Sequence, residues 1–213
     1  MEWRLLAGFP EEDVQRLIAI ARRRRFDRNE VVFHRDDPGD SLHLIAKGRF
    51  AIRIMTPLGD TATIAVRGPG ESFGEMALVG DSPRRTATVV ALEEAETYAV
   101  YKDDFHRLRA EHSSIDEVLF AFLVGEVRML NERLLEALYI SADRRILRRL
   151  HDLVQDVPGA EIPLTQEELA ELAGTTRSTV NRVLRDEERR GTVALSRGRT
   201  RVLDPTQVAR RAR

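Results

Sequence analysis

Six short apolar runs separated by turn signals lie between Val31 and about Val100, and they constrain the fold more than any other feature of the sequence. The runs are VVF, LHLIA, FAIRI, TATIAV, TATVVAL and TYAVY, and the turns between them include DPGD, PLGD and RGPG. Apolar and polar residues alternate in stretches such as Phe50–Ile54, with the two-residue period of a half-buried strand. Short strands at this spacing predict a compact antiparallel β-roll or barrel.

Amphipathic patterns flank the strand region on both sides. They predict a helix over about Glu11–Arg22 and another near Lys102–Arg109. The RRRR run at 22–25 is expected to end the first of these helices on an ordinary solvated face.

From Ile115 to about Leu138 the apolar period becomes helical, and two apolar stripes run along the helix. Because two stripes on one helix need two partners, one is expected to pack on the roll and the other on a second copy of the chain, in a two-fold homodimer. The alternative is a monomer in which both stripes form one wide core face. The first stripe consists of Phe120, Leu123, Val127, Leu130, Leu134 and Ala137, and the second of Leu119, Phe122 and Met129.

The segment LTQEELAELAGTTRSTVNRVL, residues 164–184, carries two helix starts close together. Thr165 and Glu168 form the capping-box pattern, Gly174 is expected to end the first helix, and Thr175 or Thr176 to cap the second. Two helices joined by a short glycine-containing turn are typical of a helix-turn-helix. The expected buried face of the second helix is Val180, Val183 and Leu184, with Arg177, Ser178, Asn181, Arg182 and Arg185 facing outward.

The outward residues of the second helix have the chemistry of base reading. Arg177 and Ser178 lie in its first turn and Arg182 about one turn later, where an arginine fork can donate two hydrogen bonds to guanine. A following hairpin, TVAL and TRVL around SRGR, is expected to contact DNA phosphates. The predicted DNA-binding residues are Thr176, Arg177, Ser178, Thr179, Arg182, Arg197 and Arg199, with Arg201 also near the phosphates.

The distribution of charge supports a polyanionic partner for the C-terminal part. Residues 1–140 hold 19 Lys and Arg against 24 Asp and Glu, whereas residues 141–213 hold 15 against 11. The sequence thus predicts an α+β fold in three parts: a β-roll over 1–114, a dimerisation helix over 115–140 and a DNA-binding domain over 141–213, with a hinge at Ser141–Arg144.

Several functional classes are not expected. The chain has no cysteine, which excludes disulfides, thiolate metal sites and cysteine-ligated iron–sulfur clusters. Its five histidines suggest no metal site, and no catalytic triad or acid–base pair indicates an enzyme. With no apolar run of membrane-spanning length and acidic residues near the N-terminus, a cytoplasmic protein without a membrane partner is expected.

Residues 73–89, FGEMALVGDSPRRTATV, combine the groups that a buried phosphate needs. Gly74 allows a close backbone approach, Glu75–Leu78 offers helix N-terminal amides including that of Met76, and Arg85 with Thr86 can hold phosphate oxygens. A carboxylate beside a phosphate is repulsive, so Glu75 is expected to accept a hydrogen bond from a sugar hydroxyl instead. The alternative is an ion pair between Glu75 and Arg85 that closes the roll without a ligand.

Three segments, in order, resemble the cyclic-AMP receptor protein/FNR family of transcription regulators. FGEMAL followed by RRTATV is similar to the family's phosphate-binding cassette, DDPGDSLHLIAKGRF to the turn region before it, and LTQEELAELAGTTRSTVNRVL to its helix-turn-helix. The resemblance covers nearly the whole chain. It implies a cyclic-nucleotide-binding β-roll, a long dimerisation helix and a winged helix-turn-helix, with double-stranded DNA, a second copy and RNA polymerase as partners.

The resemblance also assigns roles to residues. Glu75 would bind the ribose 2′-hydroxyl and Arg85 the cyclic phosphate, supported by Thr86. In members that respond to cyclic AMP, a threonine and the polar residue after it contact adenine, and counting back from Arg145 places these at Leu130 and Asn131. Because Asn131 can hydrogen bond to a base but Leu130 cannot, cyclic GMP and cyclic di-GMP stay open beside cyclic AMP.

A second departure concerns the DNA half-site. Ser178 stands where the best-known members have a carboxylate, so the half-site is expected to differ from theirs. The predicted function is a homodimeric DNA-binding transcription regulator gated by a cyclic nucleotide, with cyclic AMP the first candidate. The alternatives are a nucleotide-sensing subunit that acts through a protein partner, and a family member that binds DNA without a nucleotide.

Overall fold

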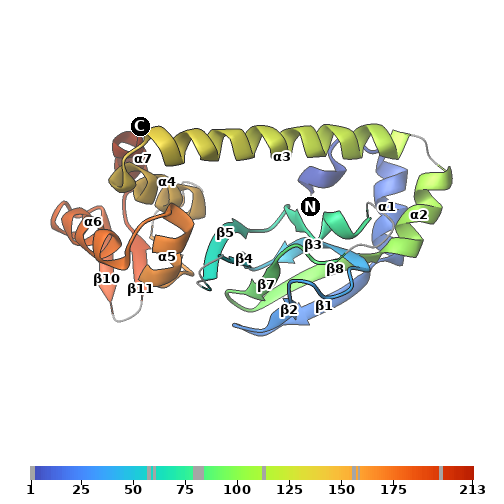
Figure 1. Cartoon of the computed structure of the whole chain (residues 1–213), viewed down its shortest axis with the longest axis horizontal. Helices are drawn as coiled ribbons and strands as arrows, with labels where there is room; N and C mark the ends of the chain where they lie inside the picture. The colour runs from blue at the N-terminus through green and yellow to red at the C-terminus, as the bar shows by residue number, and fades with distance from the viewer. Residues whose placement is uncertain are drawn as a thin grey trace. The chain divides into compact units, whose positions relative to one another are not determined.

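The computed structural model (Figure 1) describes residues 3–56, 59, 61–78, 84–111, 114–154, 157, 159–196 and 199–213. The contacts of the chain divide it into two compact units, residues 1–129 and 130–213. No helix in this described part is long and apolar enough to cross a membrane.

The described strands of the first unit form two antiparallel four-stranded sheets, which confirms the predicted roll. The strand order is β1-β8-β3-β6 in one sheet and β2-β7-β4-β5 in the other. The strands are β1 (Arg22–Phe26), β2 (Val31–Phe33), β3 (Ser41–Lys47), β4 (Phe50–Met55), β5 (Thr61–Arg67), β6 (Ser72–Phe73), β7 (Thr88–Ala91) and β8 (Ala95–Tyr101).

Two apolar clusters hold the first unit together. Phe26, Phe50 and Phe73 pack with Ile45 and Val89 in one of them. The other packs the helices against the strands, and its Trp3 indole donates a hydrogen bond of 3.1 Å to the Ile45 carbonyl. Those helices are η1 (Arg4–Leu6), α1 (Glu11–Ile20), η2 (Glu75–Leu78), α2 (Lys102–Glu111) and the start of α3 (Ser114–Tyr139).

The arginine run at 22–25 corrects one expectation, because it is a strand and not a helix end. Ala21 is already extended, with φ −71° and ψ 142°, and Arg22–Arg25 pair with β8 at the edge of the sheet. Arg23 and Arg25 both bind Glu96, and the guanidinium of Arg22 lies over Tyr101. Tertiary pairing with β8 therefore overrides the helical continuation of α1.

The two apolar stripes of α3 have different surroundings. Leu119 is buried, and Phe122 packs against the core of the first unit. Phe120, Val127, Leu130 and Leu134 are exposed by 56–70%. The division between the units falls inside this helix, after Met129. A single chain thus buries Leu119 and leaves four large side chains of the other stripe mostly exposed.

The second unit contains the predicted helix-turn-helix within a winged domain. Its helices are α4 (Ala142–Val154), α5 (Gln166–Ala173), α6 (Arg177–Arg189) and α7 (Pro205–Ala212). A sheet of order β10-β11-β9 accompanies them, formed by β9 (Ala160–Ile162), β10 (Val193–Ser196) and β11 (Arg199–Val202). The sequence patterns predict neither β9 nor α7.

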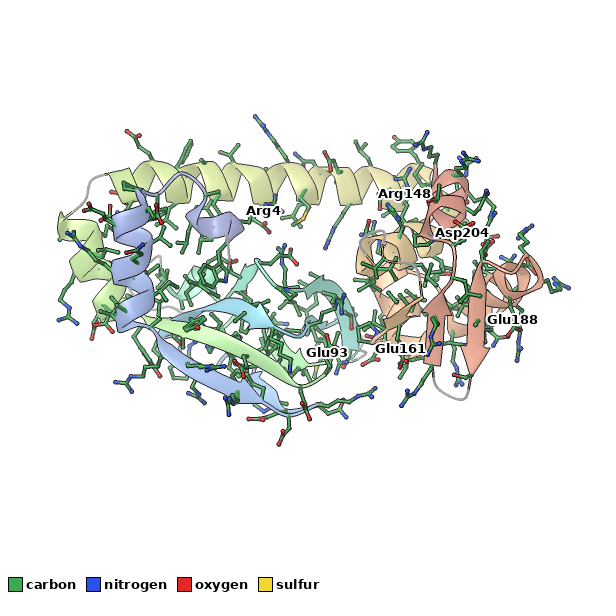
Figure 2. All side chains as sticks on the ribbon, turned by 180° about the vertical axis from the view of Figure 1, so that it is seen from behind. Arg4, Glu93, Arg148, Glu161, Glu188 and Asp204 are labelled. Atoms are coloured by element: carbon green, nitrogen blue, oxygen red, sulfur yellow. The ribbon has the colours of Figure 1, made fainter. Side chains whose placement is uncertain are left out.

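Ion pairs join the end of α3 to α4 within the second unit. Arg148, labelled in Figure 2, donates to Glu136 at 2.7 Å and to the Ala212 carbonyl at 2.8 Å. Arg149 also binds Glu136. Since α3 ends at Tyr139 and α4 begins at Ala142, Ser141 is the part of the expected hinge that lies outside a helix.

Candidate functional sites

Arg85 is a buried cation inside the β-roll, with only 5% of its surface exposed. Its Nη1 donates to the Ser41 carbonyl at 2.6 Å, and its Nη2 donates to Ser41 Oγ at 2.9 Å and Asp40 Oδ1 at 3.3 Å. The guanidinium lies 4.0 Å from the centre of the Phe33 ring. Burial lowers the pKa of Arg85 from its ordinary value, partly opposed by Asp40.

One donor of Arg85 is left open. Its Nε is buried and has no hydrogen-bond partner within the described residues. Buried polar groups are nearly always satisfied, so such a donor marks a place for a ligand or water acceptor. An anion that bound Nε could also replace the Asp40 carboxylate, whose side chain is 69% exposed.

Position 74 requires glycine because its backbone lies close to Arg85. It has φ +84°, and a Cβ at this position would lie 2.8 Å from Arg85 Nη1 and 2.9 Å from the Ser41 carbonyl oxygen. Gly74 thus lies close to atoms of the protein itself, and its predicted approach to a phosphate stays a prediction.

Glu75 opens η2 and lies in a mixed electrostatic field. Burial is the main cause that raises the pKa of Glu75, with Glu126 in the same direction and Arg67 and Arg85 opposing. Arg67 pairs with Glu71 at 2.9 Å and with Glu126 of α3 at 2.5 Å. Arg85 has Asp40 as its ion-pair partner, so the geometry does not favour the alternative in which a Glu75–Arg85 pair closes the roll.

His43 is a core residue of the β-roll whose pKa is influenced by the charge of Arg85. It is 4% exposed, stacks on Phe73 at 4.9 Å and shares a hydrogen bond of 3.0 Å between its Nδ1 and Thr97 Oγ1. Burial, followed by the charge of Arg85, lowers the pKa of His43 to about 3. The imidazole is therefore neutral at physiological pH and contributes packing.

The structure brings some of the expected ligand residues together. Gly74, Glu75 and Arg85 surround one region, Thr86 follows Arg85 with an exposed side chain, and Met76 is 49% exposed. Leu130 and Asn131 belong to the second unit, and both are exposed. Sequence reasoning missed Asp40, Ser41 and Phe33, although the DPGD turn just before Ser41 offered a signal for the first two.

The helix-turn-helix geometry follows the sequence closely. Thr165 and Glu168 form the complete capping box, and Gly174 ends α5 in the left-handed conformation with φ 61°. Thr176 caps α6 by accepting from the Thr179 amide at 3.3 Å. Arg145, which the patterns do not single out, fixes this turn by donating to the carbonyls of Ile140, Ala173 and Gly174.

The predicted DNA-reading side chains gather at the start of α6. The hydroxyls of Ser178 and Thr179 each lie 2.9 Å from Thr176 Oγ1, and Arg177 is exposed beside them. Arg182 makes two hydrogen bonds to Asp143 of α4, which raise its pKa above the ordinary value. In the wing Arg199 is exposed and approaches Glu161 at 3.5 Å, whereas Arg197 lies outside the described residues.

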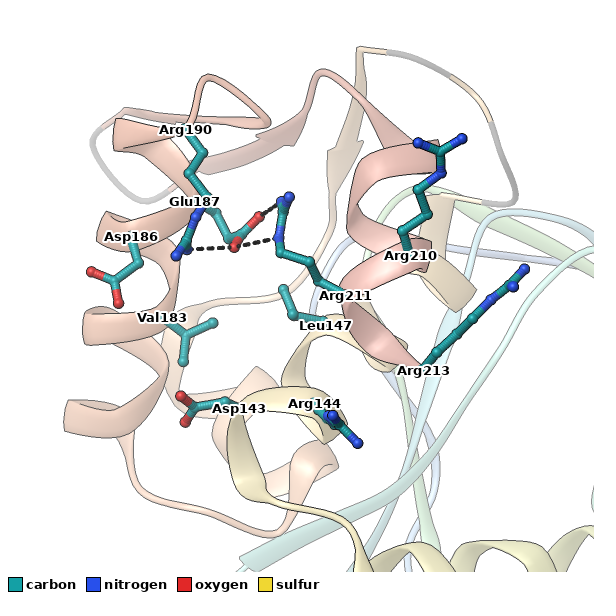
Figure 3. Close-up of a pocket in the computed structure, with 10 residues that line it drawn as sticks. All are labelled: Asp143, Arg144, Leu147, Val183, Asp186, Glu187, Arg190, Arg210, Arg211 and Arg213. Carbon is teal, nitrogen blue, oxygen red and sulfur yellow. Dashed lines mark hydrogen bonds and ion pairs between the residues drawn. The ribbon is translucent and has the colours of Figure 1, made fainter.

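A polar cavity of about 370 Å³ lies among α4, α6 and α7 (Figure 3). Figure 3 shows Glu187 of α6 between Arg190 and Arg211. Glu187 is 2% exposed and also accepts from Thr192 Oγ1 at 2.7 Å. These contacts join α6 to α7. The lining residues are Asp143, Arg144, Leu147, Val183, Asp186, Glu187, Arg190, Arg210, Arg211 and Arg213.

Each of the two units contains a segment that matches a known protein family. Residues 23–112 match the cyclic nucleotide-binding domain, and residues 144–211 match the Crp-like helix-turn-helix domain. The chain is 32% identical to the cyclic AMP receptor protein of Thermus thermophilus, over 93% of this chain and 91% of that one.

Two further similarities agree with this match. The chain is 30% identical to a CRP-like cAMP-activated global transcriptional regulator of Mycobacterium tuberculosis, over 88% of this chain and 87% of that one. The solved structure of the Thermus thermophilus catabolite activator protein is 31% identical, covers 98% of both chains and gives a TM-score of 0.57.

Proposed function

Because the chain belongs to the cyclic-AMP receptor protein/FNR family of transcription regulators, we propose that it binds DNA as a homodimer under the control of cyclic AMP. The matched families and relatives support a DNA-binding regulator gated by a cyclic nucleotide. The observation that carries the proposed nucleotide site is Arg85, a buried guanidinium with an open Nε donor beside Gly74 and Glu75.

In the proposed complex Arg85 binds the cyclic phosphate. A phosphate oxygen accepts from Nε and displaces Asp40 from Nη2, while Ser41 keeps holding the guanidinium. Thr86, which follows Arg85 in the chain, and the amide of Met76 in η2 add donors. Glu75 accepts a hydrogen bond from the ribose 2′-hydroxyl through a carboxyl oxygen.

The base of the nucleotide is assigned from relatives and from two residues of α3. Two relatives named for cyclic AMP support that ligand. On α3, Asn131 would hydrogen bond to the base, while Leu130 would supply an apolar contact instead of a hydroxyl. Cyclic GMP and cyclic di-GMP are therefore the competing ligands to measure.

The exposed stripe of α3 supports the homodimer. Four large apolar side chains on this stripe, among them Phe120 and Leu134, are more than half exposed in a single chain. Apolar surface of this extent on one helix is stabilised by a second helix of the same kind. A two-fold dimer would present two copies of α6 to successive major grooves of a near-palindromic site, about 34 Å apart.

In that dimer the start of α6 reads the bases and the wing contacts the backbone. Thr176, Arg177, Ser178 and Thr179 form the first contact group, and Arg182 reads one turn later. Arg199 and Arg197 of the wing bind phosphates. We extend the proposal to RNA polymerase as a partner on family membership alone.

Isothermal titration calorimetry of the full-length protein against cyclic AMP, cyclic GMP and cyclic di-GMP tests the effector assignment. We expect cyclic AMP to bind most tightly, with one site per chain. Absence of binding for all three nucleotides would leave a DNA-binding protein without this effector, and tighter binding of another nucleotide would replace cyclic AMP.

A further inference from the structure

The arginines on the outward side of α6 differ in what holds them. Arg177 has no hydrogen bond or ion pair to any residue that the structure describes. Arg185 and Arg189 each pair with a carboxylate of α6 itself, three residues away. Arg182 is held from a different helix, by Asp143 in the first turn of α4.

The contact between Arg182 and Asp143 uses the end of the guanidinium fork. Arg182 Nη1 donates to Asp143 Oδ2 at 3.1 Å, and Nη2 donates to Oδ1 at 2.5 Å. The next carboxylate, Asp186 Oδ2, lies 3.9 Å from Nη1, which is beyond hydrogen-bond distance. Guanine is recognised by the same kind of donor pair, directed to O6 and N7. While Asp143 holds it, this end of Arg182 is not available to a base.

The pair is nevertheless easy to open. The side chains of Arg182 and Asp143 are 55% and 47% exposed, and exposed ion pairs are weak and screened by salt. A guanine placed opposite Arg182 would therefore displace the carboxylate. A base pair without the two acceptors would leave Arg182 on Asp143, where one donor of each Nη already has an acceptor.

We propose that Asp143 is a specificity-determining residue, which makes recognition tolerant at the base pair that Arg182 reads. It does so by offering Arg182 a second partner, so that a mismatch at this position does not leave the arginine unpaired. The inference rests on the proposed role of α6 in reading DNA and goes beyond it by assigning a function to a residue of α4.

The test begins with selection of duplexes from a randomised palindromic library by the full-length protein in the presence of cyclic AMP. Wild type and Arg182→Ala are compared, and the base pair whose preference is lost in Arg182→Ala is the position that Arg182 reads. Two duplexes, which differ by guanine or adenine at that position, then serve as probes for fluorescence anisotropy.

Asp143→Asn is expected to bind the guanine duplex about two- to five-fold more tightly than wild type and to leave the adenine duplex nearly unchanged. In the Arg182→Ala background the same substitution should have no effect. Glu167→Gln, which removes one carboxylate from the exposed first turn of α5, is the charge-matched control and should not change the ratio of the two affinities.

Three outcomes would overturn the inference. Asp143→Asn could tighten both duplexes equally, or tighten binding in the Arg182→Ala background, and either result would assign Asp143 to simple repulsion of DNA. No base preference dependent on Arg182 would remove the arginine from base reading. If wild type selects no duplex, the proposed function itself fails. Circular dichroism checks folding, and Asp143→Ser repeats the measurement should Asp143→Asn not fold.

Discussion

Two arginines, Arg85 in the β-roll and Arg182 on α6, each form an ion pair with an aspartate. The side chain of Arg85 is 4% exposed and that of Arg182 is 55% exposed. Arg85 is fixed by Ser41 and by Phe33 as well as by Asp40, whereas the hydrogen bonds of Arg182 go to one carboxylate. Under the proposed function, this difference corresponds to a β-roll site that is fixed in place for one anion and to a side chain of α6 that can change partners.

The sharpest test of preorganisation is Arg85→Leu, compared with Arg84→Leu as its neighbour in sequence. Arg84 is exposed and donates to the Asp36 carbonyl at 2.8 Å, so its loss should change cyclic-nucleotide affinity less than about three-fold. Loss of Arg85 removes the charge-assisted hydrogen bonds and should weaken binding by about 100-fold or more. Calorimetry measures both, and equal effects of the two substitutions would contradict the comparison.

Gly74→Ala tests whether the β-roll site tolerates any added atom. The new Cβ would meet Arg85 Nη1 and the Ser41 carbonyl, and φ is +84°, so we expect a loss of about 2–4 kcal/mol in stability. Gly191→Ala is the matched control, because Gly191 has φ +72° with nothing within 4 Å, and it should cost about 1 kcal/mol. Urea denaturation distinguishes the two, and an equal cost would show that the contact with Arg85 is relaxed.

The buried His43 makes the stability of the β-roll depend on pH. Its folded-state pKa of about 3 lies below the ordinary 6.5, so the unfolded chain binds a proton first as the pH falls. Stability contributed by neutral His43 is full above pH 6.5 and falls by about 1.4 kcal/mol per pH unit below it, down to about pH 3. His43→Phe should remove this slope in urea denaturation at pH 5–8, whereas His34→Gln, at an exposed position, should retain it.

For α6 we expect smaller effects on DNA affinity, which differ between Arg177 and Arg182. Arg177 has no partner among the described residues. The substitution Arg177→Ala should therefore lower the affinity for a selected duplex by about ten-fold or more. Arg182→Ala should cost about two- to five-fold, because its contact with a base replaces the contact with Asp143. Anisotropy titrations measure both losses, and a larger loss for Arg182 would reverse the ranking.

The sequence predicts the regular parts of the molecule well because local chemistry decides them. Turn residues and alternation predicted the roll. The capping box and Gly174 predicted the first helix of the helix-turn-helix, and a cap at Thr175 or Thr176 predicted the second. The strand at Arg22–Arg25 was missed because its partner, β8, is about 75 residues away in the chain, and a run of four arginines has no strand signal of its own.

The candidate sites show the same limit. The cassette residues Gly74, Glu75 and Arg85 were predicted, but the partners that hold Arg85, namely Asp40, Ser41 and Phe33, come from other strands and turns. Asp143 and the buried Glu187 network were also missed, since nothing local in the sequence says which acidic residue faces which arginine. Spacing therefore predicts candidate groups for a site, and tertiary structure is needed to find which other residues hold them in place.

The most direct test of the account is the affinity of the full-length protein for a selected palindromic duplex, with and without saturating cyclic AMP, measured by fluorescence anisotropy. The account predicts an increase of about ten-fold or more with the nucleotide, and no increase for Arg85→Leu. Equal affinity of the wild-type protein in both conditions would contradict it.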